Sequence, residues 1–138
     1  MRGDAGLGRL KRPGRVGEDG RQALGRRAEE AAASYLEASG FILLGRNVRV
    51  RRLEIDLVAR EGAVVVVVEV RTRSPGAWVK ALDSVDWRKR KRVRSAGEWL
   101  WKSRFHADRT LERMRFDLIA VSFDEQGAPT VEHVRAAF

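Results

Sequence analysis

Four charged side chains stand out because they occupy positions in two predicted strands where apolar residues would be expected to continue. In the stretch 53–59 every second residue lies on the same face of a strand, so Glu54 and Asp56 share a face. Directly after a run of valines, Glu69 and Arg71 share a face of the following strand. Two acids, then an acid and a cation, are side chains expected of a site that handles a charged ligand.

These four side chains meet if the two strands form a hairpin. A two-residue turn at 62–63, with glycine first as a type II′ turn requires, places Asp56 opposite Glu69 and Glu54 opposite Arg71. Moving the turn one residue earlier changes the partners but keeps all four side chains on one face, whereas a longer loop could reverse that parity. Two carboxylates facing each other across antiparallel strands lie roughly 5 Å apart and repel, unless a proton or a cation lies between them.

A divalent metal ion would remove this repulsion. Oxygen ligands without nearby histidine or cysteine suit Mg²⁺ or Mn²⁺, so the pattern predicts a metal site at Asp56 and Glu69, with Glu54 as an accessory residue. The alternative is a set of ion pairs, in which Glu54 meets Arg71 and the other two acids meet arginines of the stretch 49–52. A metal beside a cation has the parts needed for phosphodiester hydrolysis, because both stabilise negative charge developing on the phosphoryl group.

The charge balance points to the same class of substrate. The 138 residues include 28 Lys and Arg against 19 Asp and Glu, which gives a formal net charge of +9. This surplus favours a polyanionic partner, of which DNA is the first candidate and RNA the second. The alternative is that the charge serves solubility alone. The chain has no cysteine, which excludes disulfides and cysteine-ligated metal centres.

The densest positive charge lies in one predicted helix, at about 84–103. Its cations follow Trp87, which could stack on an exposed base or anchor the helix as a half-buried side chain. The cations expected to contact nucleic acid are Arg88, Lys89, Arg90, Lys91, Arg92 and Arg94. Trp99 and Trp101 are expected to be half-buried anchors.

Hydrophobic periodicity and turn signals predict the elements that must position these residues. Apolar residues at intervals of three and four predict a helix over 22–39, and the basic, glycine-rich residues 1–20 predict a disordered tail before a single domain at 21–138. Strands are predicted at 41–50, 53–59, 63–71, 115–123 and 130–135. The valines are apolar on both faces of their strand, so helices must cover both sides of the sheet. The result is an α/β fold in the order α-β-β-β-α-β-β.

Three further residues are interpreted from these elements. Glu29 lies at the border of the apolar stripe of the first helix and can reach the sheet, although an ion pair with Arg26 is the alternative. Asp117 interrupts an apolar strand and is expected to be a buried partner of Arg115, with an acidic site residue as the alternative. His133 belongs to no acidic or nucleophilic constellation, so no chemistry is assigned to it.

Several blocks of sequence, occurring in a fixed order, carry a family resemblance. They are Leu-Gly-Arg-Arg-Ala-Glu-Glu-Ala-Ala (24–32), Arg-Asn-Val-Arg (46–49), Glu-Ile-Asp-Leu-Val-Ala (54–59), Val-Glu-Val-Arg-Thr-Arg-Ser (68–74), Ala-Leu-Asp-Ser-Val-Asp (81–86), Arg-Phe-Asp-Leu (115–118) and Val-Glu-His (131–133). Together they resemble the YraN-like family of predicted endonucleases. That family is similar to archaeal Holliday-junction resolvases and to the PD-(D/E)xK nucleases, which implies a restriction-endonuclease-like αβββαβ core with a mixed central sheet flanked by helices.

The resemblance also implies roles for individual residues. Asp56 and Glu69 match the metal-binding acids, Arg71 matches the position of the motif lysine, and Glu29 matches the helix glutamate of the resolvase-like branch. Two positions depart from the family pattern, because Leu53 stands where glycine is usual and arginine replaces the lysine. An arginine side chain keeps the positive charge but cannot give up a proton, so it retains charge stabilisation and loses water activation.

The interpretation is a Mg²⁺- or Mn²⁺-dependent DNA endonuclease, acting on branched or junction DNA, with the catalytic residues Glu29, Asp56, Glu69 and Arg71. The alternative is a catalytically weak or inactive DNA- or RNA-binding module that uses the arginine-rich helix and the basic tail. The longest apolar run, 63–68, is too short to cross a membrane and no signal sequence is present, so we expect a cytoplasmic protein without a membrane partner. The sequence does not decide whether the protein forms a homodimer.

Overall fold

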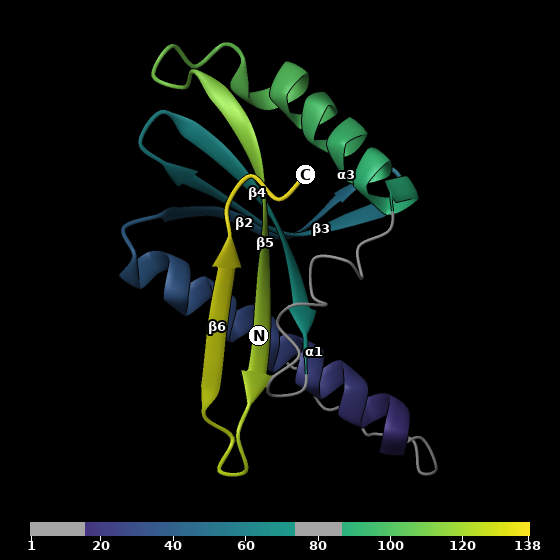
Figure 1. Ribbon diagram of the computed structural model, residues 1–138. Coiled ribbons are helices and arrows are strands. Elements are labelled where there is room, and N and C mark those ends of the chain that lie inside the picture. Colours follow the sequence, from purple (N-terminus) through teal and green to yellow (C-terminus); the bar gives the residue numbers. More distant parts are fainter. Residues whose placement is uncertain (1–15, 74–86) are drawn as a thin grey trace, which may run out of the picture.

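The computed structural model describes residues 16–73 and 87–138, and its elements follow the predicted order (Figure 1). The elements are α1 (Val16–Ala38), β2 (Ile42–Val50), β3 (Leu53–Glu61), β4 (Val64–Thr72), α3 (Trp87–Leu100), the π-helical turn η1 (Trp101–Phe105), β5 (Arg113–Phe123) and β6 (Pro129–Val134). The predicted order of one helix, three strands, a second helix and two strands is confirmed.

The largest difference from the sequence-based boundaries is at the start of α1. The helix begins at Val16 and so includes the last part of the stretch predicted as a disordered tail. Glycines at 17 and 20 lower the helix propensity there, but extending an existing helix costs far less than starting one. Residues 1–15 and the predicted helix start at 84–86 lie outside the described residues.

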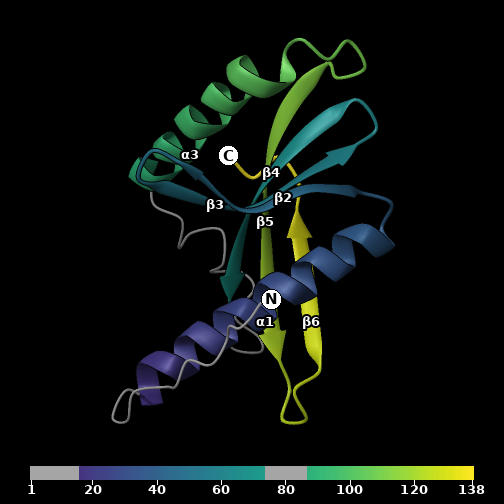
Figure 2. The same ribbon diagram turned by 180° about the vertical axis from the view of Figure 1, so that it is seen from behind.

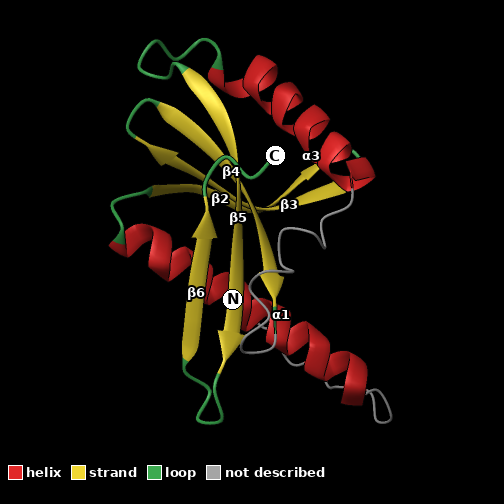
Figure 3. Ribbon diagram, in the orientation of Figure 1, coloured by secondary structure: helices red, strands yellow, loops and turns green. Residues whose placement is uncertain are grey.

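The strands form one five-stranded mixed sheet in the order β2-β3-β4-β5-β6. Neighbouring strands are antiparallel except β4 and β5, which are parallel and whose connection contains α3. Figures 1 and 2 show α1 on one face of the sheet and α3 on the other, and Figure 3 shows the same layers coloured by element type. The fold is therefore a mixed sheet flanked by helices, compatible with a restriction-endonuclease-like core.

The valine run of β4 explains why both faces are covered. Val66 and Val68 belong to the core under α1, together with Leu36, whereas Val65 and Val67 belong to the core under α3. All four valines are fully buried. A strand with apolar side chains on both faces can reach this burial only at the centre of a three-layer structure.

The turn between β3 and β4 has the predicted form. Glu61 pairs with Val64, so the loop consists of Gly62 and Ala63, and Gly62 has a positive φ of 59°, as the first central residue of a type II′ turn requires. The paired register runs back only as far as Leu57 opposite Val68. Beyond that point β3 and β4 diverge, which opens the sheet at the position of the predicted acids (Figure 1).

Asp117 is the centre of a buried polar network under β6, as its predicted structural role requires. The carboxylate accepts hydrogen bonds from Arg115 Nε at 2.8 Å and Nη2 at 2.9 Å and from the Ala136 N–H at 2.9 Å. His133 Nε2 lies 2.7 Å from the same carboxylate, and its Nδ1 lies 3.0 Å from the Tyr35 hydroxyl. The network joins α1, β5 and β6, so its function is to hold the sheet and helix together.

Replacing Asp117 by asparagine is expected to lower the free energy of unfolding by about 1–3 kcal/mol, because it removes the main negative partner of the partly buried Arg115, which keeps only its ion pair with Glu61. Burial raises the pKa of Asp117, but hydrogen bonds from His133, Arg115 and Ala136 outweigh burial and lower it to about 2. The carboxylate therefore stabilises the fold above its ordinary pKa of 3.8, and this contribution is lost as the pH falls toward 2. Urea unfolding from pH 7 to pH 2 measures both effects, with the exposed Glu125→Gln as a control that should change neither.

Candidate functional site

The site lies where β3 and β4 separate. Continuing the hairpin register would place Val70 opposite Ile55, but the Val70 N–H instead donates to Asp56 Oδ2 at 2.8 Å. The carboxylate thus replaces a ladder hydrogen bond and satisfies a backbone donor at the fork. The strand faces also switch here, because Ile55 packs in the core under α3 while Leu57 packs under α1. The predicted regular alternation over 53–59 is therefore wrong at this point, since a twisted strand leaving its neighbour rotates its side chains.

Glu69 is the most buried acid of the site, with 4% of its surface exposed. Its Oε2 lies 2.7 Å from Lys89 Nζ and 3.2 Å from Arg71 Nη2. The predicted alternative of ion pairs to the stretch 49–52 is wrong for this acid, because its cations come from its own strand and from α3. Helix α3 lies on the face of the sheet that Glu69 shares with Val65 and Val67, so a lysine of its first turn can reach this carboxylate.

Asp56 lies close enough to Glu69 for the two carboxylates to affect each other. The pKa of Asp56 is raised to about 7, first by burial and then by the negative charge of Glu69. The hydrogen bond from Val70 and the charge of Lys89 act in the opposite direction, and the charge of Glu29 raises the pKa further. The structure thus places Asp56 near Glu69, with Glu29 close enough for its charge to act on Asp56, and near neutral pH Asp56 is partly protonated.

Glu29 reaches the site from the other side of the sheet. Its Oε1 accepts a hydrogen bond from Asn47 Nδ2 at 3.2 Å, rather than pairing with Arg26. Asn47 has a positive φ of 49°, a conformation that asparagine tolerates better than most residues. Sequence reasoning missed this asparagine as a site residue, although its tolerance for left-handed backbone within a predicted strand was a usable signal.

Glu54 does not join the other acids. It is exposed, it lies opposite Arg49 in the β2–β3 pairing, and among the described residues it forms no ion pair with Arg71. The prediction that four side chains share one face is therefore wrong for this residue. The reason is that β3 has left β4 before reaching it, so the hairpin register no longer applies.

The cations of α3 divide into two groups. Lys89 and Arg90 are partly buried, and Lys89 contacts the site, whereas the remaining cations are exposed: Arg88, Lys91, Arg92 and Arg94. Trp87 is 66% exposed and Trp99 is 45% exposed. The prediction of a half-buried anchor is thus wrong for Trp99 and confirmed for Trp101, which packs against the core under α3. Helical spacing assigned the cations correctly to one helix but could not show which of them faces the sheet.

The carboxylate oxygens of the site suit a hard divalent cation that is held by few protein ligands, rather than a metal enclosed by protein ligands on all sides. No group of three or more His, Cys, Asp or Glu side chains converges within residues 16–73 and 87–138. Mg²⁺ requires less than that, because it commonly binds through one or two carboxylates and completes its shell with water and substrate phosphate. Asp56 and Glu69 supply two oxygen ligands of this kind, and the pKa of Asp56 is raised first by burial and then by the charge of Glu69. These residues fit the metal that the sequence predicts.

Sequence comparisons place the chain in a known family. The model of the uncharacterised protein family UPF0102 matches residues 28–121. A UPF0102 protein of Sorangium cellulosum is 55% identical over 120 residues, covering 87% of this chain and 83% of its own. A UPF0102 protein of Anaeromyxobacter dehalogenans is 48% identical over 122 residues, covering 87% of each chain. The chain belongs to the UPF0102 family.

The part of the chain that matches the UPF0102 model contains the whole site. Residues 28–121 include Glu29, Asp56, Glu69 and Lys89, together with β2, β3, β4 and most of β5. A third relative, the UPF0102 protein of Acidothermus cellulolyticus, is 41% identical over 125 residues, covering 86% of this chain and 95% of its own. No described helix of this UPF0102 protein combines the length and apolarity needed to cross a membrane.

Proposed function

We propose that this UPF0102 protein is a Mg²⁺-dependent DNA endonuclease that acts on branched or junction DNA. The observation that carries the proposal is the cluster at the β3–β4 fork, where two carboxylates lie beside an ammonium and a guanidinium. Opposed carboxylates accompanied by cations are the groups that metal-dependent hydrolysis of a phosphodiester requires. The net charge of +9 supports a polyanionic substrate.

Each acid has a distinct task in this proposal. Asp56 and Glu69 would hold the metal, with Asp56 losing its proton as the metal binds. Bound Mg²⁺ supplies positive charge that stabilises the phosphoryl oxygens and favours deprotonation of an attacking water. Glu29, held by Asn47, adds a third carboxylate that can orient a water at the edge of the site.

Lys89 supplies what Arg71 lacks. Both cations contact Glu69 Oε2, but an ammonium is compact, rotates freely and can exchange a proton, whereas a guanidinium is a fixed planar charge. The replacement of the motif lysine by arginine therefore leaves the site with a lysine, which arrives from α3 instead of β4. We assign Lys89 to positioning the attacking water and Arg71 to stabilising negative charge.

One observation favours the alternative of a binding module without activity. Glu69 already has two cationic partners, so its charge is balanced without a metal. If these ion pairs are stronger than metal binding, the site would stay closed to Mg²⁺ and the protein would bind nucleic acid only.

The deciding experiment is incubation of the purified protein with linear, nicked, forked and four-way DNA in Mg²⁺, Mn²⁺ or EDTA. Strand cleavage that requires the metal supports the nuclease. Thermal unfolding with and without metal is the second measurement, because metal bound at Asp56 and Glu69 should raise the melting temperature. If the protein shows no cleavage and no stabilisation by metal, the nuclease proposal fails and the binding module is the remaining explanation.

Restoring lysine at position 71 tests the division between the two cations. Arg71→Lys is expected to preserve or raise the cleavage rate, because the charge remains and the smaller ammonium can approach the water. Arg71→Gln, which removes the charge, is expected to lower the rate about 10- to 100-fold, a smaller loss than removal of Lys89 causes. Equal rates for wild type, Arg71→Lys and Arg71→Gln would show that Arg71 contributes only to folding.

A further inference from the structure

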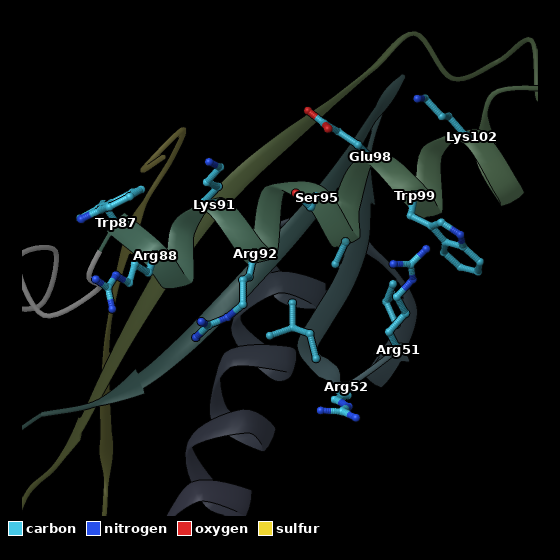
Figure 4. A pocket seen from close by; sticks show the side chains of 13 residues that line it. Arg51, Arg52, Trp87, Arg88, Lys91, Arg92, Ser95, Glu98, Trp99 and Lys102 are labelled. Carbon is cyan, nitrogen blue, oxygen red and sulfur yellow. The ribbon is translucent and has the colours of Figure 1, made fainter.

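A groove of about 900 Å³ runs between α3 and the turn that joins β2 to β3 (Figure 4). The described residues that line it include a single acid, Glu98. The cations that line it are Arg51, Arg52, Arg88, Lys91, Arg92 and Lys102. Because the cations come from both walls, the groove attracts a polyanion along its length rather than at one point.

Two exposed tryptophans stand at the ends of the groove. Trp87 and Trp99 both line it, and Figure 4 shows them at opposite ends of α3. Twelve residues of helix separate them, a distance of about 18 Å along the axis. Their rings are 66% and 45% exposed, and exposed indole faces are preferred surfaces for stacking nucleobases.

The combination selects one form of nucleic acid. In a duplex the base faces are covered by neighbouring bases, so a tryptophan beside it can reach the backbone and the base edges but cannot stack on a base. In a single strand the bases are free to turn toward the tryptophans while the phosphates follow the arginines. We propose that this groove binds single-stranded nucleic acid, stacked on Trp99 and Trp87 and held by the cations of α3 and the β2–β3 turn.

The groove and the carboxylate site share helix α3 and the start of β3. Arg88 lines the groove, and the next residue, Lys89, contacts Glu69. Leu53 forms the other wall, three residues before Asp56. None of Asp56, Glu69 and Lys89 lines the groove, so a strand bound there would lie on the same helix as the site without entering it. Binding therefore rests on the groove alone and not on the proposed function.

The backbone of the turn gives a way to test charge without harming the fold. Arg51 has a positive φ of 57°, a conformation that strains an arginine but not a glycine. Arg51→Gly therefore removes a cation from the groove and relieves the turn at the same time. A loss of binding in this variant cannot be attributed to a weakened structure, and thermal unfolding checks this directly.

The experiment is fluorescence anisotropy with a labelled oligothymidylate and a labelled hairpin duplex of equal charge, both in EDTA so that no cleavage occurs. Trp99→Leu is expected to weaken oligothymidylate binding roughly 5- to 100-fold, while duplex binding changes less than about twofold. Arg51→Gly combined with Arg92→Gln is expected to lower the salt dependence, as the slope of log affinity against log salt, by about 1.4. The control pair Arg104→Gln and Arg109→Gln, two exposed arginines outside the groove, should retain the wild-type preference for the single strand.

Three results would overturn the inference. The first is equal weakening of single-strand and duplex binding by Trp99→Leu, which would reduce the groove to a phosphate contact. The second is an acidic peptide that displaces the oligothymidylate at lower concentration than unlabelled oligothymidylate does, which would identify a protein as the occupant. The third is unchanged oligothymidylate binding in Trp99→Leu. If the wild type cleaves DNA and Trp99→Leu binds oligothymidylate as the wild type does, single-strand binding in the groove is refuted and the nuclease proposal stands. Binding that depends on Trp99 in a protein that never cleaves DNA would refute the nuclease and leave the groove.

Discussion

Replacing Asp56 by asparagine is expected to lower the rate of metal-dependent cleavage by at least about a thousandfold, equivalent to about 4 kcal/mol. The amide can still accept the hydrogen bond from Val70, so the fork should keep its shape, but it is a poor ligand for Mg²⁺. The stabilisation of the folded protein by added metal should disappear in the same variant. Cleavage assays and thermal unfolding in a metal titration measure the two effects.

The same variant should be more stable than wild type without metal. The pKa of Asp56 is raised above its ordinary value of 3.8 to about 7, so the folded state binds more protons between these values and loses stability as the pH rises. Above pH 7 the carboxylate of Asp56 is charged and buried, which destabilises the folded state, and asparagine removes this charge. The expected gain is on the order of 1–4 kcal/mol in the free energy of unfolding, with a flatter dependence on pH from 4 to 8.

Glu69→Gln is the matched comparison, because Glu69 is the acid that has ionic partners. Its loss should also stop cleavage, but it leaves Lys89 and Arg71 without their shared carboxylate and should lower stability. The nuclease proposal would be contradicted if both variants cleaved DNA at the wild-type rate. A loss of stability in Asp56→Asn equal to that in Glu69→Gln would mean that Asp56 serves the fold and not a metal.

Replacing Lys89 by methionine is expected to lower the turnover rate about 10²- to 10³-fold, the loss typical when a charged group that stabilises the transition state is removed. Methionine keeps the length of the side chain and its helix propensity, so α3 should remain intact. Lys91→Met is the control, since Lys91 lies on the same helix and is exposed. Single-turnover cleavage at saturating DNA measures the rate without the effect of weaker binding.

Lys89→Arg separates charge from chemistry at this position. It retains a cation beside Glu69 and should restore stability, but a guanidinium cannot exchange a proton with the attacking water. The expected result is wild-type stability with a low turnover rate. If Lys89→Met and Lys91→Met lose activity to the same extent, Lys89 has no special role and the two lysines act only through general attraction of DNA.

Much of this architecture is determined locally. The period of two in the strands, the five valines from 64 to 68 and a glycine able to adopt a positive φ at 62 are properties of neighbouring residues. They sufficed to predict the order of the elements, the two-residue turn and the hairpin register as far as Leu57 opposite Val68. Short-range sterics and hydrogen bonding decide these features, so they can be read without knowing the fold.

The rest was decided by packing between distant segments. The divergence of β3 from β4 excluded Glu54 from the site, because a register predicted from a turn holds only while the strands remain paired. The docking of α3 on the sheet brought Lys89 to Glu69, twenty residues along the chain, and left Trp99 on the surface beside Arg51 and Arg52. Helical periodicity gives the relative directions of side chains on one helix but not the rotation at which that helix meets the sheet. That rotation depends on how Val93, Ala96 and Leu100 are buried against the sheet, and only the tertiary structure fixes it.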